Sequence, residues 1–347
     1  MGGNALNLVG LQARRLSASE FDSLVSGVRN ASQDVLHWIE PVKFYHTKPD
    51  MGDIDFVAHP KSDVRGKEIV EWGEKIMQRL GSKGYYYNKP VLSFEYQGVQ
   101  IDIAAKYSDE AAKAYLEFCH YSPIGNVVGR MIKQTGAKWG IDGLVYPVRD
   151  GNDETSHMLG YIPLSTNIEA PMKLAGLDPE IWKAGFENED DIYAFCVESR
   201  LFNKEIFAFE NLNHINRKRD RLRKDYHAWL DYIKDKPDKY KRYENIEEKL
   251  QRKAEWFEVL REMFPESKLK EERAKLLEAA DEKRMLNQKF NGNVVKELTG
   301  LEGKELGQFL TSFKKSFGEG KGYDAWIKRS SLDDIKAEVV RQFSLRP

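Results

Sequence analysis

The sequence predicts an α+β fold in which a first half of mixed strands and helices is followed by an all-helical second half. Over roughly the first 200 residues, short apolar segments bounded by Gly, Pro and Asn alternate with segments of helical period, as they do in α+β domains. After Gly185 no glycine occurs until Gly292, and Glu, Lys, Arg and Leu dominate that stretch, which is typical of long helices.

Capping and turn signals predict the first elements. Ser17 and Glu20 have the spacing of a capping box, so an amphipathic helix is expected over residues 17–39. Two strands are expected at residues 42–47 and 54–57, joined by a tight turn at 49–52. A second helix is expected over residues 64–80.

A hairpin and two further helices follow. Apolar segments at residues 91–96 and 99–104 flank the dipeptide Gln97-Gly98, which predicts two strands joined by a tight turn. The remaining elements of this half are expected to be helices at residues 109–119 and 126–134 and strands at residues 143–148 and 158–163.

The second half is expected to be helical over residues 190–287, with interruptions near Pro237 and Pro265 because proline breaks a helix. The last segment, residues 290–310, predicts two short helices with turns at Gly300 and Gly303. The chain is thus divided into an N-terminal helical segment, a mixed region, a helical region and a C-terminal helical domain, at residues 1–40, 41–200, 201–289 and 290–347.

The composition limits the classes of function. The 347 residues have a formal net charge of −1, so any binding to nucleic acid must come from local basic patches. No apolar run approaches the ~20 residues that span a membrane, which argues against a membrane partner. Cys119 and Cys196 lack metal-ligand spacing, so a reducing, cytoplasmic location with buried thiols is expected.

Three aspartates in two apolar strands indicate a metal site. In PDMGDIDFVA (residues 49–58), Asp53 and Asp55 lie on the same side of a strand because side chains alternate. VQIDIAA (residues 99–105) carries Asp102 in a second strand of similar character. Carboxylates this close repel one another unless a cation lies between them, and Mg²⁺ prefers such ligands together with substrate phosphates. Two Mg²⁺ ions, or Mn²⁺, are therefore expected; three unrelated, exposed aspartates are the alternative.

Around these aspartates the sequence resembles the DNA polymerase β-like nucleotidyltransferase superfamily. GDIDFVA and QIDIAA resemble its catalytic palm, and AYLEFCHYSPIGNVVGRMIKQTGAKWGIDGL (residues 114–144) resembles a passage of family X DNA polymerases. IPLSTNIEAPMKLAGLDPEIW is similar to the closing segment of that family. The resemblance covers residues 42–200 and implies a palm built on a mixed sheet with flanking helices. It also implies that Asp53, Asp55 and Asp102 are the catalytic, metal-binding residues.

The same resemblance implies a site for the incoming nucleotide. Asn126 would contact the nucleotide, and Arg130, on the same face of a helix that follows Pro123, would lie against nucleotide or primer–template. A helix cap and a surface charge are the respective alternatives. Tyr121 and Gly125 differ from the Gly and Phe that family X members tend to have, which leaves the choice between ribose and deoxyribose open.

The phosphate-binding turn of the superfamily is not evident. Its Gly-Ser or Gly-Gly pair would lie upstream of the aspartates, where this chain reads FYHTKPDMG. Gly52 allows the backbone to approach a phosphate closely. Further contacts would come either from Gly2 and Gly3 at the chain start or from His46 and Lys48.

Two later segments indicate binding to nucleic acid. In NLNHINRKRDRLRKDYHAW (residues 211–229), Arg217, Arg221 and Lys224 are expected to share one helical stripe with aromatic residues behind it, and a solvated helix face is the alternative. FNGNVVKELTGLEGKELGQFL (residues 290–310) resembles the helical C-terminal region of CCA-adding tRNA nucleotidyltransferases and bacterial poly(A) polymerases. The alternative is that its glycines serve helix packing alone.

Together these features predict a Mg²⁺-dependent, template-independent nucleotidyltransferase that moves a nucleoside monophosphate from an NTP such as ATP, or from a dNTP, to a nucleic-acid 3′ end by a two-metal mechanism. RNA, and tRNA in particular, is favoured by the tail. A gap-filling DNA polymerase similar to family X is the runner-up, favoured by the segment with Asn126 and Arg130. A catalytically idle nucleic-acid-binding or phage-type structural protein is the third possibility. The three intact carboxylates argue against it, and the unusual placement of Gly2 and Gly3 argues for it.

Overall fold

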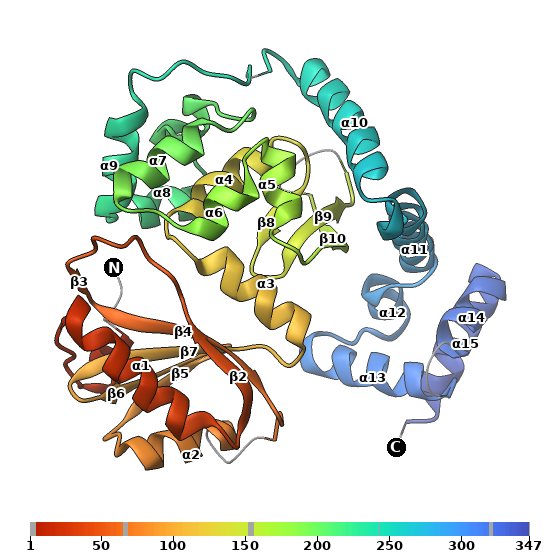
Figure 1. Cartoon of the computed structure of the whole chain (residues 1–347). Helices are drawn as coiled ribbons and strands as arrows, with labels where there is room; N and C mark the ends of the chain where they lie inside the picture. The colour runs from red at the N-terminus through yellow and green to blue at the C-terminus, as the bar shows by residue number, and fades with distance from the viewer. Residues whose placement is uncertain (1–4, 65–68, 152–155, 242, 319–321, 347) are drawn as a thin grey trace. The chain divides into compact units, whose positions relative to one another are not determined.

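The computed structural model describes residues 5–64, 69–151, 156–241, 243–318 and 322–346 (Figure 1). The chain divides into two compact units: unit 1 comprises Met1–Pro147 and Tyr161–Leu269, and unit 2 comprises Val148–Gly160 and Lys270–Pro347. The domain boundaries expected after residues 40 and 200 fall inside unit 1, and the one expected after residue 289 falls inside unit 2. The α+β class with a helical C-terminal half is confirmed.

A mixed five-stranded sheet is the base of unit 1. In sheet order its strands are β2 (Leu36–Pro41), β4 (Asp53–Pro60), β7 (Val99–Ala105), β6 (Val91–Tyr96) and β5 (Tyr85–Asn88). The neighbours β4 and β7 are parallel, and the other neighbouring strands are antiparallel. The predicted β6–β7 hairpin is confirmed. Its turn residues Gln97 and Gly98 have φ angles of 52° and 80°, as a tight two-residue turn requires.

Helices cover both faces of this sheet. On one face, α1 (Ala18–Ser32) and α2 (Glu71–Leu80) pack against a core that contains Ile54 and Phe56 of β4. On the other face, α3 (Asp109–Cys119) contributes Ala112 to a smaller cluster with Val57 and Ala104 (Figure 1). Because side chains alternate along a strand, Asp53 and Asp55 share the face of Val57, on the α3 side.

Three predicted elements are wrong in their bounds; one is the second helix, which begins at Glu71 rather than at residue 64. The first helix ends at Ser32 rather than at residue 39, and the strand expected at residues 42–47 lies instead at Leu36–Pro41. The reason is tertiary, since residues 36–41 pair with β4 along the edge of the sheet, and this pairing outweighs the helical period that continues through Ile39. The strand β5 and the two-stranded sheet of β1 (Leu16–Ser17) and β3 (Asp50–Met51) were not predicted.

The rest of unit 1 follows α3. It begins with α4 (Ile124–Lys133) and a three-stranded sheet of β8 (Lys138–Gly140), β9 (Gly143–Arg149) and β10 (Met158–Ser165), in which residues 148–160 group with unit 2. Its later helices are α5 (Glu169–Ala175), α6 (Pro179–Ala184), α7 (Glu189–Val197), α8 (His214–Asp220), α9 (Lys224–Ile233) and α10 (Ile246–Met263).

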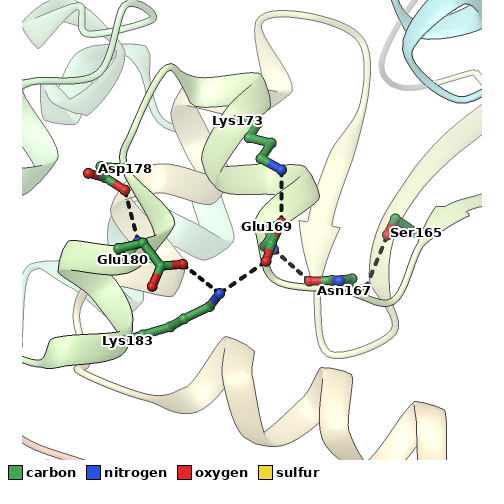
Figure 2. Close-up of polar contacts among 7 residues, drawn as sticks. All are labelled: Ser165, Asn167, Glu169, Lys173, Asp178, Glu180 and Lys183. Atoms are coloured by element: carbon green, nitrogen blue, oxygen red, sulfur yellow. Dashed lines mark hydrogen bonds and ion pairs between the residues drawn. The ribbon is translucent and has the colours of Figure 1, made fainter.

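Ion pairs on the surface of unit 1 join α5 to α6 (Figure 2). Lys183 of α6 donates to Glu169 of α5 at 3.0 Å and to Glu180 at 2.7 Å, and Lys173 donates to Glu169 at 2.8 Å. Exposed pairs of this kind contribute little stability one by one. The network therefore links the two helices but adds little to the free energy of folding.

Beyond residues 148–160, unit 2 is helical, with α11 (Leu269–Lys289), α12 (Gly292–Thr299), α13 (Gly303–Lys315), α14 (Gly322–Arg329) and α15 (Leu332–Ser344). Gly300 ends α12 with a φ of 71°, and α13 begins at Gly303, which confirms the two predicted turns. Phe309, Phe313 and Ile335 are buried in the core of these helices. In the described part of the chain, no helix has both the length and the apolar composition that a membrane span requires.

Candidate active site

The parallel pairing of β4 with β7 brings the three predicted aspartates together. Asp55 is in register with Asp102, and Asp53 lies two residues earlier on the same face of β4. One carboxylate oxygen from each residue lies within 4.8 Å of the others. Among the described residues, these three form the one cluster of His, Cys, Asp or Glu side chains with ligand atoms that close. The aspartates are therefore not scattered over separate surfaces.

The electrostatics of this cluster favour a bound cation. The side chain of Asp55 is exposed in a pocket, but crowding by protein atoms, with the charges of Asp53 and Asp102, raises its pKa to about 8. Burial also raises the pKa of Asp102 to about 6, although hydrogen bonds from Ser93 and Gln100 act in the opposite direction. Because oxygen donors suit hard divalent cations, the cluster could hold a metal ion that stabilises all three charges.

The aspartates line a pocket of unit 1 with a volume of approximately 420 Å³. This volume falls within the range of small-molecule sites. The remainder of the wall combines apolar and aromatic side chains with cations, and the cations are Lys43, Lys48, Arg219 and Arg223. A phosphate ligand that arrives with divalent cations needs both kinds of charge, because the carboxylates bind the cations and the basic groups bind the phosphate oxygens.

The segment before β4 places one predicted phosphate contact in the pocket wall. Lys48 lines the pocket, with its Nζ 5.6 Å from the ring centre of Phe44. His46 does not line it; its Nδ1 lies 3.2 Å from an oxygen of Glu187 on the exposed surface.

The predicted glycines lie elsewhere. Gly52 separates β3 from β4 and is not part of the pocket wall. Gly2 and Gly3 lie outside the described residues.

The two residues of α4 that were expected to contact the nucleotide lie in different surroundings. Asn126 lines the pocket from the first turn, while Pro123 occupies the N-cap position, so the alternative role of Asn126 as a helix cap is wrong. Arg130 does not line the pocket. Its guanidinium donates to Asp220 and, at 2.7 Å, to the hydroxyl of Tyr226. Only 13% of the Arg130 side chain is exposed, so the alternative, that Arg130 is a surface charge, is wrong. Contact between Arg130 and a nucleotide stays a prediction.

The predicted basic stripe does not form. The helix α8 ends at Asp220 and α9 begins at Lys224, so Arg217, Arg221 and Lys224 do not share one helix. Arg217 donates to the carbonyl oxygens of Phe209 (2.9 Å) and Leu212 (2.8 Å), which fixes the loop before α8.

Two other arginines of this segment were missed. Arg221 and Lys224 are exposed and do not line the pocket, and their binding to nucleic acid stays a prediction. Arg219 and Arg223 do line it. Arg219 and Arg223 have the same i, i+4 spacing as Arg217 and Arg221, so the sequence could not show which pair faces the pocket.

A buried glutamine holds Asp102 in place. The Nε2 of Gln100 lies 3.0 Å from both carboxylate oxygens of Asp102, and its Oε1 accepts a hydrogen bond from the backbone N–H of Leu6 at 3.3 Å. Gln100 is 1% exposed and Leu6 is fully buried. The donor from Leu6 fixes the orientation of the amide, so the NH₂ group must face Asp102.

The substitution Gln100→Leu is therefore expected to lower the rate of the reaction at this site by about 10- to 100-fold, the usual cost of losing a residue that orients a ligand-bearing side chain. We expect the effect in kcat rather than in KM, because Gln100 does not line the pocket. Steady-state kinetics measures this difference. Gln78→Leu, which changes an exposed glutamine of α2, is the matched control and should retain the wild-type rate.

The thiol in the pocket is not a nucleophile. Cys119 lines the wall, but burial, with a further contribution from Asp55, raises its pKa to about 12. Since the thiolate is the reactive form, the side chain stays unreactive at neutral pH. Cys196 is buried, as expected, and burial raises its pKa as well.

Without metal ions, the stability of the protein is expected to fall as the pH rises from 7 to 8.5. Asp55 keeps its proton in the native state up to a pKa of about 8, whereas an aspartate in the unfolded chain, with a pKa of 3.8, is already ionised. The native state then binds more protons than the unfolded state, so the free energy of unfolding declines with pH. Urea unfolding in EDTA measures this slope. It should become shallower with Mg²⁺ or in Asp55→Asn, and an unchanged slope in that variant would contradict the assignment.

Comparisons with protein-family models and with curated proteins give no significant match to this chain. The arguments for its function therefore come from its own residues.

Proposed function

We propose that this chain is a Mg²⁺-dependent nucleotidyltransferase that moves a nucleoside monophosphate from a nucleoside triphosphate to the 3′ hydroxyl of a nucleic acid, with RNA as the favoured acceptor. The observation that carries the proposal is the convergence of Asp53, Asp55 and Asp102 in a pocket whose wall also holds four cations. A site that binds a metal-bound polyphosphate needs this combination of charges. The similarity of residues 42–200 to the polymerase β-like palm supports the same function.

The reaction follows from the charges of the wall. The acceptor oxygen forms a bond to the α-phosphorus, the bond from that phosphorus to the bridging oxygen breaks, and pyrophosphate leaves with the electron pair. Asp102, which Gln100 and Ser93 orient, is the candidate to receive the proton of the hydroxyl. Lys48 is placed to contact the polyphosphate. Mg²⁺ bound by the three aspartates would neutralise charge on the phosphates and lower the pKa of the attacking hydroxyl.

Aromatic and polar side chains of the pocket suit the remainder of a nucleotide. Phe44 and Tyr115 line the pocket, and a base would stack on the ring face that Lys48 or Lys106 does not cover. Asn126 offers an amide that can donate and accept hydrogen bonds. These contacts do not distinguish ribose from deoxyribose. Preference for RNA depends on the similarity of the tail to tRNA nucleotidyltransferases.

An incorporation assay tests the proposal. The protein is incubated with Mg²⁺, each labelled NTP or dNTP in turn, and single-stranded RNA, tRNA or gapped DNA. We expect an acceptor lengthened at its 3′ end, no product in EDTA, and the highest rate with an RNA acceptor and an NTP. A preference for gapped DNA and dNTP would favour the runner-up function, a gap-filling DNA polymerase, over transfer to RNA. Absence of product in every combination, from folded protein, would reject the proposal.

A further inference from the structure

Arg219 and Arg223 line the pocket of the aspartates from the segment that ends α8 and precedes α9. The two residues are four apart and flank Asp220 and the following turn. They belong to a part of the chain about 120 residues beyond Asp102, outside the segment that resembles a palm.

A buried ion pair holds this segment in position. Asp220 is fully buried, and its two carboxylate oxygens are both used: one accepts from Arg130 of α4 and the other from the Nε of Arg219 at 2.9 Å. The hydroxyl of Tyr226 accepts from Arg130 at 2.7 Å and donates to the carbonyl of Phe207 at 2.5 Å. The backbone N–H of Arg223 donates to the carbonyl of Asp220 at 3.1 Å, so the network restrains the backbone that carries both arginines.

Among the residues that the structure describes, no hydrogen bond or ion pair uses the outer nitrogens of Arg219 or Arg223. Asp220 contacts Arg219 at Nε, which leaves the two terminal NH₂ groups for another partner. Arg223 is half-buried, and within the described ranges no carboxylate forms an ion pair with its guanidinium. A half-buried guanidinium without a counter-charge is costly, and an anionic ligand in the pocket would compensate it.

We propose that Arg219 and Arg223 form a binding site for a phosphate group of the substrate. This inference rests on the proposed function, and it deepens that function by assigning the pocket wall contributed by the helical segment. A planar guanidinium offers paired N–H donors that match two phosphate oxygens, which the ammonium of Lys48 cannot do. The phosphate belongs either to the polyphosphate of the nucleotide or to the backbone of the acceptor strand.

Equilibrium binding distinguishes these two sources without any need for catalysis. Inorganic tripolyphosphate and ATP, each with Mg²⁺, are titrated into wild-type protein, Arg219→Gln, Arg223→Gln and the double variant by calorimetry. A fluorescent single-stranded RNA is titrated into the same proteins by anisotropy at several salt concentrations. Lys218→Gln, which removes an exposed charge of α8 that does not line the pocket, is the matched control. Thermal unfolding verifies that every variant is folded.

If the site binds the nucleotide, the arginine variants should lose about 10- to 100-fold in affinity for tripolyphosphate and ATP, the range expected for hydrogen bonds to charged groups. If it binds the acceptor, RNA affinity should fall instead, and the slope of log affinity against log salt should decrease by about one for each arginine. Wild-type affinities for all three probes in folded Arg219→Gln and Arg223→Gln would overturn the inference, as would equal losses in Lys218→Gln.

The outcomes also separate this inference from the proposed function. A wild-type protein that transfers nucleotides while its arginine variants bind normally would refute the phosphate site alone. A wild-type protein that binds the probes through these arginines but transfers no nucleotide would refute the proposed reaction and retain the site.

Discussion

The substitution Asp102→Asn is expected to lower the rate of nucleotide transfer by at least ~10³-fold in a protein that folds normally. Asparagine preserves the shape of the side chain and can still accept from Gln100, but it has no charge to hold a divalent cation and cannot receive the proton of an attacking hydroxyl. The loss of several kcal/mol of transition-state stabilisation corresponds to this factor. Single-turnover incorporation at saturating substrate measures it.

Two controls make this result specific to the aspartate cluster. Asp142→Asn removes an exposed carboxylate that pairs with Lys106 outside the pocket, and should change the rate by less than about twofold. The Asp102→Asn protein should also bind Mn²⁺ more weakly by electron paramagnetic resonance. A transfer rate within tenfold of wild type would show that the reaction does not depend on this carboxylate.

The same substitution should stabilise the metal-free protein. Above pH 8, where Asp55 is ionised as well, the three carboxylates repel one another; burial and this repulsion are the causes that raise the pKa values of Asp55 and Asp102. Removing one charge relieves it, so the free energy of unfolding in EDTA should rise while activity is lost. Opposite effects on stability and rate are expected where function requires charges that the fold alone disfavours.

Local signals predicted much of the fold. The strands β6 and β7, their turn at Gln97 and Gly98, and the helix α3 are specified by residues adjacent in sequence, and the structure confirms them. The strand β2 was missed because its pairing with β4 joins residues about 20 positions apart, which no local window contains. The grouping of residues 148–160 with unit 2 depends likewise on contacts with a later part of the chain.

The acidic half of the site was predictable and the basic half was not. Alternation along β4 places Asp53 and Asp55 on one face, and the similar character of β7 suggested that Asp102 would join them. The choice among the arginines depended on where α8 ends. An uninterrupted helix would have aligned Arg217 with Arg221, whereas the break after Asp220 places Arg219 and Arg223 in the pocket wall.

The contacts of the buried Gln100 and the nearly buried Arg130 could not be predicted from the sequence. Gln100 reads as an ordinary polar position of a strand, and its partner Leu6 is 94 residues away in sequence. Arg130 was expected near the nucleotide or primer–template because of the resemblance to family X polymerases. In the structure it reaches Asp220, 90 residues later, and such a buried pair becomes visible only in three dimensions.

The substitution Asp220→Ala is expected to destabilise unit 1 by about 3 kcal/mol or more, because it leaves the nearly buried Arg130 without a counter-charge. The corresponding decrease in Tm is on the order of 6–12 °C for a unit of this size. Calorimetry measures it. Asp231→Ala, which changes an exposed aspartate of α9, is the matched control and should stay within about 0.5 kcal/mol of wild type.

The double variant Arg130→Met with Asp220→Leu separates the stability of this pair from its effect on the pocket. Apolar side chains of similar volume often replace a buried ion pair at little cost, so the double variant should recover most of the stability that Asp220→Ala loses. It cannot restore the hydrogen bond from Arg219 to Asp220. If that contact orients Arg219, the double variant should be stable and still bind tripolyphosphate or RNA more weakly than wild type. Wild-type binding in the stable double variant would show that the ion pair supports the fold and has no part in the pocket.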